Sequence, residues 1–198
     1  MLWHINTMKK LFLIALFLLI SACGLAKSPT PFVATDITGA DFPQPLKLTD
    51  HMGKLRTMTD FKGKVVMLFF GYTHCPDVCP TTMSDLKNTM KLLGNKADQV
   101  QVLFVTVDPA RDTQEVLRQF VPSFDKRFIG LRGSLQETAE TLANFKIFYS
   151  KVEGKTKDDY SIDHSAGMYV FDKKGKIRLY INYGEKPVEM ASDVSKLL

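Results

Sequence analysis

The sequence predicts an α/β domain with a central mixed β-sheet flanked by helices, because continuous apolar runs alternate with amphipathic segments and the chain closes with a hairpin pattern. The two runs are "VVMLFF", residues 65–70, and "VQVLFVTVDP", residues 100–109. Neither run alternates apolar with polar residues, which is typical of strands buried on both faces. The 198 residues are 45% hydrophobic and show no internal repeat, so we expect one globular domain preceded by a leader.

The segments around the first apolar run predict a hairpin and a helix. Residues 35–64 carry two short extended pieces separated by "FPQP" and a loop closed by Gly63, a pattern that favours an N-terminal hairpin extension. After the run, "TTMSDLKNTMKLLG" has apolar residues at three- and four-residue spacings and ends at Gly94. This periodicity predicts an amphipathic helix with a stop signal.

The second apolar run is followed by a helix, a strand and a second helix. "RDTQEVLRQFVPSF" predicts a helix that Asp112 caps and Pro122 limits, and "FIGLRG" predicts a short strand. Ser134 and Glu137 form a capping-box pattern, which opens a helix that we expect to continue to about Phe145.

The C-terminal part of the chain predicts a loop, a hairpin and a helix. "KIFYSK" suits extended backbone, and the polar residues 152–163 predict a loop. "GMYVFDKKGKIRLYIN" predicts a hairpin that turns at residues 173–175, and residues 187–198 predict a final helix. The resulting order is that of a thioredoxin-like fold with an N-terminal hairpin extension and an inserted strand and helix. Loops at the carboxyl ends of central strands converge on the binding site of such sheets, and a loop with two cysteines lies there.

The beginning of the chain has the three parts of an export signal. Two lysines precede ten unbroken apolar residues, 11–20, and small residues follow. The end of this segment resembles a bacterial lipobox, so we expect residues 1–22 to be a signal peptide and Cys23 to be lipidated. Residues 23–34 then form a flexible tether, and residues 35–198 form the thioredoxin-like domain.

The charge pattern favours a membrane-anchored protein and excludes nucleic acid as a partner. Removal of residues 1–22 takes away two lysines and no acid, which lowers the formal net charge from +5 to +3. The remaining lysines are interleaved with acids and glycines rather than clustered on one face. We expect a protein of the bacterial cell envelope, attached to a membrane through its lipid anchor and facing the periplasm or the extracytoplasmic side.

Cys75 and Cys79 are four residues apart, one more than in the dithiol motif of oxidoreductases. Both thiols address one face if the segment is a turn of helix, and amides at the start of a helix favour a thiolate. A thiolate is both a metal ligand and a nucleophile, so the pair alone does not separate metal binding from redox chemistry. A structural disulfide across so short a loop would restrict little of the unfolded chain.

The positions of the histidines help to separate metal binding from redox chemistry. His51 lies in a polar loop and is interpreted as a surface residue, and His74 would point away from Cys75 in extended backbone. His164 precedes the strand predicted near residues 167–171, where the fold brings its last hairpin against the cysteine loop. Two thiolates and one imidazole suit copper, Cu(I) especially, although zinc accepts the same donors. The neighbouring Asp163 is expected to orient the imidazole.

Three blocks of sequence resemble the Sco (SenC-type) family of membrane-anchored copper proteins, in its bacterial lipoprotein form. They are "GYTHCPDVCPTT", "VTVDPARDT" and "DHSAGMYVFD", and the resemblance runs from about Phe32 to the C-terminus. It implies that Cys75, Cys79 and His164 hold one copper ion, Cu(I) or Cu(II), per chain. It also implies a metallochaperone that assists assembly of the binuclear copper site of cytochrome c oxidase, with the copper-bearing subunit of a haem-copper oxidase as partner.

The resemblance implies supporting roles for further residues. Asp77, Asp108, Arg111 and Asp163 match family positions that support the ligands or the loop, and Tyr72 and Thr73 match as loop packing. Gly167 departs from the family, where a bulkier apolar residue is common, so we expect a more mobile loop around His164.

Other readings remain open at this point. A thiol-disulfide reductase that keeps the cysteines of the oxidase reduced would use the same thiols, with Cys75 attacking, and its partners would include other periplasmic copper chaperones or thioredoxin-like reductants. A sensor would bind a partner through the polar segment 147–163. A peroxidase is disfavoured, because Pro76 and Tyr72 occupy the positions of the groups that activate a peroxidatic thiolate.

Overall fold

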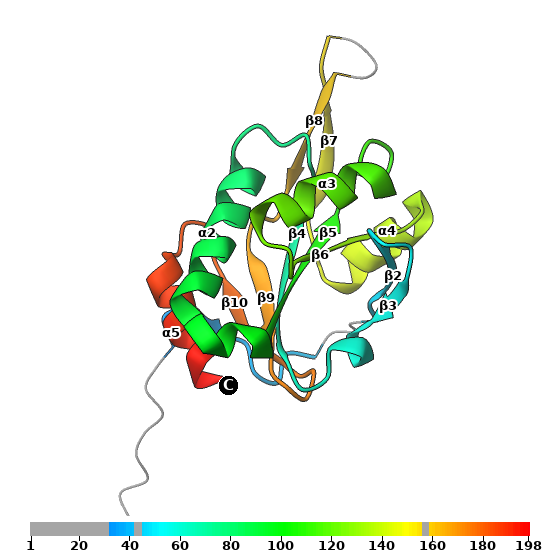
Figure 1. Ribbon diagram of the computed structural model, residues 1–198. Coiled ribbons are helices and arrows are strands. Elements are labelled where there is room, and N and C mark those ends of the chain that lie inside the picture. The colour runs from blue at the N-terminus through cyan, green and yellow to red at the C-terminus, as the bar shows by residue number, and fades with distance from the viewer. Residues whose placement is uncertain (1–31, 42–44, 156–158) are drawn as a thin grey trace, which may run out of the picture. The chain divides into compact units, whose positions relative to one another are not determined.

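An eight-stranded sheet organises the part of the chain that the structure describes, residues 32–41, 45–155 and 159–198 of a computed structural model (Figure 1). The strand order is β1-β10-β9-β4-β5-β6-β2-β3. The central strands β4, β5 and β6 are parallel, and the remaining pairs are antiparallel. The predicted mixed sheet is therefore confirmed. An N-terminal hairpin is present, but it consists of β2 and β3, whereas β1, the extended piece before "FPQP", pairs with β10.

The elements have the following bounds. The strands of the large sheet are β1 (Thr35–Asp36), β2 (Lys47–Asp50), β3 (Leu55–Thr57), β4 (Val65–Gly71), β5 (Val100–Thr106), β6 (Ile129–Arg132), β9 (Met168–Phe171) and β10 (Ile177–Ile181). A separate pair consists of β7 (Tyr149–Glu153) and β8 (Tyr160–His164). The α-helices are α2 (Val78–Leu93), α3 (Gln114–Phe124), α4 (Leu135–Asn144) and α5 (Pro187–Lys196), and the short 3-10 helices are η1 (Met58–Phe61) and η2 (Gly94–Gln99).

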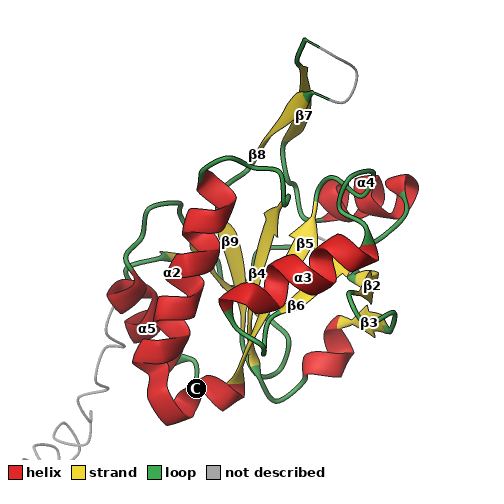
Figure 2. Ribbon diagram, turned by 45° about the horizontal axis from the view of Figure 1, so that its top comes forward, coloured by secondary structure: helices red, strands yellow, loops and turns green. Residues whose placement is uncertain are grey.

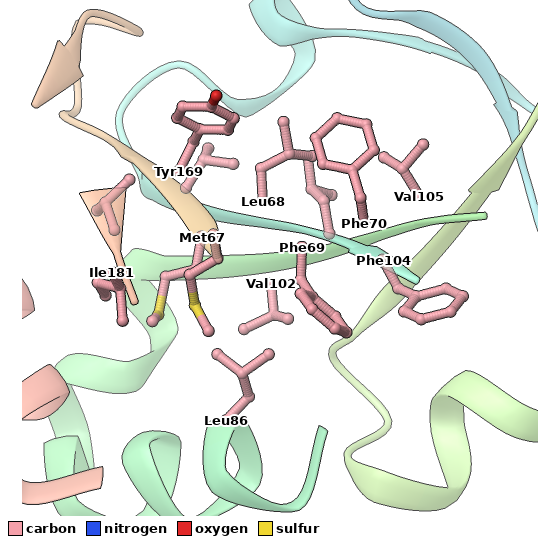
Figure 3. Packing of buried hydrophobic residues seen from close by; sticks show 14 of the residues in the cluster. Met67, Leu68, Phe69, Phe70, Leu86, Val102, Phe104, Val105, Tyr169 and Ile181 are labelled. Carbon is pink, nitrogen blue, oxygen red and sulfur yellow. The ribbon is translucent and has the colours of Figure 1, made fainter. Parts of the chain in front are cut away.

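The core lies on both faces of the two central strands. All residues of β4 and β5 are buried, as their continuous apolar runs predict. Side chains alternate between the faces, so Met67 and Phe69 point towards Leu86 of α2, whereas Leu68 and Phe70 point to the opposite side (Figure 3). Neither face of β4 is therefore available to solvent.

Different helices cover the two faces of the sheet. On the face of α2, the rings of Phe104 in β5 and Phe120 in α3 lie 5.7 Å apart, and α5 packs on α2 (Figure 2). On the other face, the ring of Phe70 lies 5.3 Å from that of Phe145, at the end of α4. This three-layer arrangement places the end of β4 and the start of α2 at one end of the sheet, where the cysteine loop joins them.

Several element boundaries differ from the sequence predictions. Helix α2 begins at Val78, so Cys79 lies in its first turn rather than in a preceding loop. Thr113, not Asp112, caps α3, because its hydroxyl accepts a hydrogen bond from the amide of Val116. Pro122 does not end this helix, which continues to Phe124. The capping box of Ser134 and Glu137 is confirmed at the start of α4.

The prediction of a loop over residues 152–163 was wrong. The described part of this segment belongs to the β7–β8 hairpin, which projects beyond the rest of the domain (Figure 1). Its composition is polar because most of β7 is exposed, so the apolar pattern that marks a buried strand is missing.

His51 is buried, contrary to the sequence interpretation. Only 8% of its surface is exposed, and its Nδ1 accepts a hydrogen bond of 3.0 Å from the amide of Gly130 in β6. His51 therefore joins the β2–β3 hairpin to the sheet and is not a surface residue.

The predicted signal peptide, the lipidation site Cys23 and most of the tether lie outside the described residues. Within the described ranges, no helix combines the length and the apolar character needed to cross a membrane. At the start of the domain, the buried carboxylate of Asp193 in α5 accepts hydrogen bonds of 2.8 Å from the amides of Val33 and Ala34. These bonds fix the first described residues to α5.

An acidic turn before α5 generates a pH-dependent prediction. Burial raises the pKa of Glu185 to about 7, and the nearby carboxylates of Asp193 and Glu189 raise it further than burial alone would. A raised pKa means that ionisation destabilises the folded state, so the contribution of Glu185 to stability is lost as the pH rises from about 4.5 to about 7.

We expect Glu185→Gln to make the protein more stable than wild type at pH 8 and to change its stability little at pH 4. Urea unfolding of both proteins across this pH range measures the difference. Glu140→Gln, on the exposed side of α4, is the control and should show no such divergence. Parallel stability curves for Glu185→Gln and wild type would contradict the prediction.

Candidate metal centre

The cysteine loop begins where β4 ends, and the last residue of that strand, Gly71, must be small. A Cβ added at Gly71 would lie 2.9 Å from a ring carbon of Phe104 and 3.0 Å from Sγ of Cys79. Such distances are too short for carbon next to these atoms, so only glycine allows the loop to turn here with Cys79 packed against the strand. The backbone of β4 thereby sets the position of the Cys79 sulfur.

Cys79 and His164 lie in contact, as the sequence predicts for the cysteine loop and the last hairpin. Cys79 is fully buried in the first turn of α2, and its Sγ lies 3.6 Å from Nε2 of His164 at the end of β8. The ring of Tyr72 meets the imidazole edge to face, with centroids 6.0 Å apart. Two predicted metal donors, 85 residues apart in sequence, thus face one another.

The hydrogen bond on the other ring nitrogen fixes the tautomer of His164. Nδ1 lies 2.9 Å from the carbonyl oxygen of Ser165. A carbonyl oxygen only accepts, so Nδ1 carries the proton and Nε2 presents its lone pair towards Cys79. Burial lowers the pKa of His164, although the Ser165 bond and the charge of Asp163 act in the opposite direction. The imidazole is therefore neutral at pH 7, the form that binds metal.

Cys75 lies nearer to solvent than Cys79. Both are free thiols, and Cys75 is partly exposed. Its sulfur accepts a hydrogen bond of 3.5 Å from the amide of Cys79. A pocket of about 500 Å³ opens between the cysteine loop and β8, and Tyr72, Cys75 and His164 lie in its wall. Cys75 therefore stands at the entrance and Cys79 behind it.

The expectation that the helix start favours a thiolate at Cys79 was wrong. Burial is the largest influence on this group and raises its pKa well above the usual range, which Tyr72 offsets only in part. The first-turn amides of α2 do not outweigh the loss of solvation. Cys79 is therefore a neutral thiol at pH 7 and needs a strong partner, such as a metal ion, to release its proton.

A buried carboxylate holds the cysteine loop in place. Asp112 accepts hydrogen bonds from the Thr73 amide at 3.0 Å, the Thr73 hydroxyl at 2.5 Å and the Thr106 hydroxyl at 2.6 Å. Thr73 belongs to the cysteine loop, whereas Thr106 ends β5. Burial raises the pKa of Asp112, and the bonds to the two threonines lower it. The carboxylate thus ties the loop to the strand beside it.

A second network holds β8 and therefore His164. Tyr160 donates from its hydroxyl to Asp108 at 2.8 Å, and Arg111 donates to another oxygen of Asp108 at 2.5 Å. The guanidinium also donates to the carbonyl oxygen of Tyr160 at 2.9 Å and lies over its ring. The amide of Ile162 donates to the hydroxyl oxygen of Tyr72 at 3.2 Å. These contacts join β8 to the loop after β5 and to the cysteine loop.

The remaining predicted residues lie at or near the pocket. Asp77 and Asp163 line it, but the ring of His164 is oriented by the Ser165 carbonyl rather than by the Asp163 carboxylate. His74 is about half exposed, contacts Thr73 and does not line the pocket.

Gly167 has a packing reason that the sequence does not show, and the more mobile loop around His164 stays a prediction. This glycine is buried, and an added Cβ would collide with the ring of Tyr180 in β10. The close approach of Tyr180 requires glycine here, so the segment between His164 and β9 is packed. The sequence signal was present, but its cause, a tyrosine on the neighbouring strand, becomes visible only in the fold.

Comparison with known proteins assigns this chain to a family. The sequence model of the SCO1/SenC family matches residues 34–198, which include the whole site. The chain belongs to the SCO1/SenC family. A SCO2-like protein of Rickettsia prowazekii is 36% identical over 148 residues, covering 73% of this chain and 72% of the relative. The human mitochondrial SCO2 homolog is 35% identical over 149 residues, covering 74% of this chain and 55% of the relative.

Solved structures of SCO1/SenC proteins share the fold. Copper-bound ScoI of Bradyrhizobium japonicum matches with a TM-score of 0.74 and 37% identity, over 80% of this chain and 100% of that one. Apo Sco1 of Thermus thermophilus matches with a TM-score of 0.75 and 35% identity, over 85% of this chain and 98% of that one. The predicted thioredoxin-like fold is confirmed by these neighbours.

The role of Asp112 generates a prediction for loop stability. An asparagine offers one acceptor oxygen where three donors converge, so Asp112→Asn leaves a buried donor without an acceptor. We expect a loss of about 1–3 kcal/mol in the free energy of unfolding, together with faster amide exchange at Thr73. Urea unfolding and hydrogen exchange measure the two effects.

Glu115→Gln is the control for this experiment, because Glu115 is exposed on the first turn of the neighbouring α3. The control should change stability by less than about 0.5 kcal/mol. Equal stability of Asp112→Asn and the control would show that the carboxylate does not hold the loop.

Proposed function

We propose that this protein binds one copper ion through Cys75, Cys79 and His164 and delivers it during assembly of the binuclear copper site of cytochrome c oxidase. The observation that carries the proposal is the 3.6 Å contact between Sγ of Cys79 and the lone pair on Nε2 of His164. Similarity to a ScoI protein solved with copper bound supports the choice of metal.

The separation of these two donors suits a shared metal ion. Metal–sulfur distances of about 2.3 Å and metal–nitrogen distances of about 2.0 Å place the two donors about 3.5–3.7 Å apart in tetrahedral or trigonal geometry. The observed 3.6 Å falls in this interval. Cys79 and His164 therefore need little rearrangement to act as a pair.

Cys75 completes the set by moving. Among the described residues, no three His, Cys, Asp or Glu side chains already stand together as a full ligand set. The sulfur of Cys75 accepts the Cys79 amide in this structure, and its partial exposure leaves room for another rotamer. A fixed pair with one movable ligand suits a carrier, because a ligand that moves away opens a position for exchange.

The donor types favour Cu(I). Two thiolates and one imidazole are soft or intermediate ligands, which Cu(I) prefers, and three protein ligands leave a position open to an incoming thiolate or imidazole. Loading displaces the proton of the neutral Cys79 thiol, so copper binding releases protons and tightens as the pH rises. The neutral His164 releases none.

We expect His164→Ala to weaken Cu(I) binding by at least about tenfold, because a three-coordinate site loses one of its donors. Anaerobic titration of the reduced fragment from Ala26 onward, with Cu(I) and a competing chelator, measures the affinity. His74→Ala is the matched control: His74 is also a histidine beside a cysteine but does not line the pocket, so its affinity should equal that of wild type.

The same titration separates delivery from the second candidate function. Two free thiols four residues apart, one in the loop near the entrance and one in the first turn of α2, also suit a thiol-disulfide reductase that keeps the cysteines of the oxidase reduced. If wild type binds no copper tightly and forms a disulfide that exchanges readily with small thiols, we would conclude that the protein is a reductase and not a copper carrier. Unchanged affinity in His164→Ala would remove His164 from the ligand set.

We further propose that the protein is an envelope lipoprotein anchored through Cys23, with the copper-bearing subunit of a haem-copper oxidase as its partner. The tripartite leader and the lipobox support the anchor. Wild type should be released from membranes only by detergent. We expect Cys23→Ser to appear in the soluble fraction without detergent. A variant that still requires detergent would mean that residues 1–22 remain as an uncleaved anchor, and Ser21→Ala serves as the control that should keep the protein on membranes.

A further inference from the structure

The β7–β8 hairpin leaves one edge of β7 unpaired. Within the described ranges the two strands form a sheet of their own, and no strand pairs with β7 on its outer side. Hairpin residues pair directly, Tyr149 with His164 and Lys151 with Ile162. Antiparallel pairs alternate between residues that exchange hydrogen bonds across the hairpin and residues whose amides and carbonyls point outwards. The register therefore determines which backbone groups of β7 face away from β8.

The contacts of β8 identify these groups. The amide of Ile162 donates to Tyr72, and the carbonyl of Tyr160 accepts from Arg111, so both point away from β7. Their cross-strand partners, Lys151 and Glu153, must then direct their own amides and carbonyls to the opposite, outer edge. Tyr149, opposite His164, follows the same alternation. The outer edge thus offers a regular row of backbone donors and acceptors.

Apolar surface lies beside this edge. Phe148 is 62% exposed, Tyr149 43% and Val152 44%, although all three are large apolar or aromatic residues. Tyr149 also borders a groove of about 450 Å³ between α4 and the loop after β5, whose wall includes Pro109 and Leu135. Leu135, on the groove, is 72% exposed. A strand lying along β7 would cover these side chains.

The charges on the edge select the occupant. Lys151 is the central residue of the edge, with Tyr149 and Glu153 on the same face of the hairpin. Two copies that paired antiparallel about this residue would place the two lysines opposite each other, which is unfavourable. A lysine on an edge also discourages indiscriminate pairing. Lys151 already forms an ion pair of 2.9 Å with Glu153 on its own strand and lies over the ring of Tyr160. An acidic residue opposite Lys151 together with a basic residue opposite Glu153 extends this ion pair across the edge, so the edge favours a different protein over a second copy.

We propose that the outer edge of β7 is a strand-addition site for an extended segment of a partner protein. In that segment an acidic residue lies opposite Lys151, and an apolar residue lies opposite Tyr149 and covers the groove. An antiparallel segment then reads basic, any residue, acidic, any residue, apolar from its N-terminus, because Glu153 is met first. The added strand lies about 10 Å from β8, the strand that carries His164. The proposal stands independently of the metal.

A designed peptide tests the edge directly. The probe is the capped peptide Thr-Lys-Val-Glu-Val-Phe-Thr, added to the isotope-labelled soluble protein and followed by NMR amide shifts and hydrogen exchange. We expect saturable shifts and exchange protection at Tyr149, Lys151 and Glu153. A control peptide with Lys in place of Glu should bind about fivefold more weakly. Absence of shifts at these amides up to about 1 mM peptide would overturn the proposal.

Two variants give the test a charge swap and a backbone control. Lys151→Glu should reverse the preference between the two peptides. Lys151→Pro removes an outward amide that β8 does not use, so it should abolish protection by either peptide while the Ser150–Asp163 pairing stays protected. Equal binding of both peptides by wild type and Lys151→Glu would overturn the proposal. If the same amides shift with protein concentration in the absence of peptide, the occupant of the edge is a second copy, and the proposal of a partner protein is overturned.

The copper titration separates this proposal from the proposed function. Lys151 does not line the pocket between the cysteine loop and β8, so Lys151→Glu should bind Cu(I) as wild type does. If wild type and Lys151→Glu both bind the two peptides equally well and both bind copper normally, the docking edge is refuted and the proposed copper function is not. If His164→Ala loses copper binding but still binds the peptide, the proposed strand-addition site is supported.

Discussion

One buried carboxylate, that of Asp112, determines whether the cysteine loop can have its observed shape. It receives three hydrogen bonds from Thr73 and Thr106, and the fully buried hydroxyl of Thr106 would otherwise lack an acceptor. The bonds join the end of β5 to the residue that follows Tyr72, so the loop leaves the sheet in a defined direction. Helix α2 then starts at Val78, which brings Cys79 under the end of β4. Burial raises the pKa of the Asp112 carboxyl, and the hydrogen bonds from Thr106 and Thr73 lower it only in part.

A second network positions the other half of the site. Asp108, Arg111 and Tyr160 hold β8 by its edge, and the strand in turn presents His164. Cys79 and His164 are 85 residues apart in sequence, yet their sulfur and nitrogen atoms lie in contact. Tyr72 adds a ring contact with His164 and a hydrogen bond from the amide of Ile162. The site is therefore a product of tertiary structure. Its electrostatics have the same origin, because burial keeps both Cys79 and His164 neutral.

Features that depend on neighbouring residues could be predicted from the sequence, whereas features that depend on distant residues could not. The apolar runs of β4 and β5 and the capping box of α4 are local patterns, and the structure confirms them. Asp112 has the chemistry of a helix cap, but Thr73, 39 residues earlier, gives it another role. His51 lies in a polar stretch, yet it is buried and accepts a hydrogen bond from the amide of Gly130. The β7–β8 hairpin lacks a fully buried face, so its composition resembles that of a loop. The meeting of the cysteine loop with His164 was predictable from the order of elements, whereas the neutral state of Cys79 required knowledge of its burial.

The absence of a side chain at Gly71 has a consequence for the order of events at the site. Cys79 packs against the strand at that glycine, where its sulfur lies 3.0 Å from the position that a Cβ would take. Cys75, partly exposed, is the thiol that a visiting molecule meets first. A molecule that enters the pocket between the cysteine loop and β8 therefore reaches the sulfur of Cys75, in the pocket wall, before that of the buried Cys79.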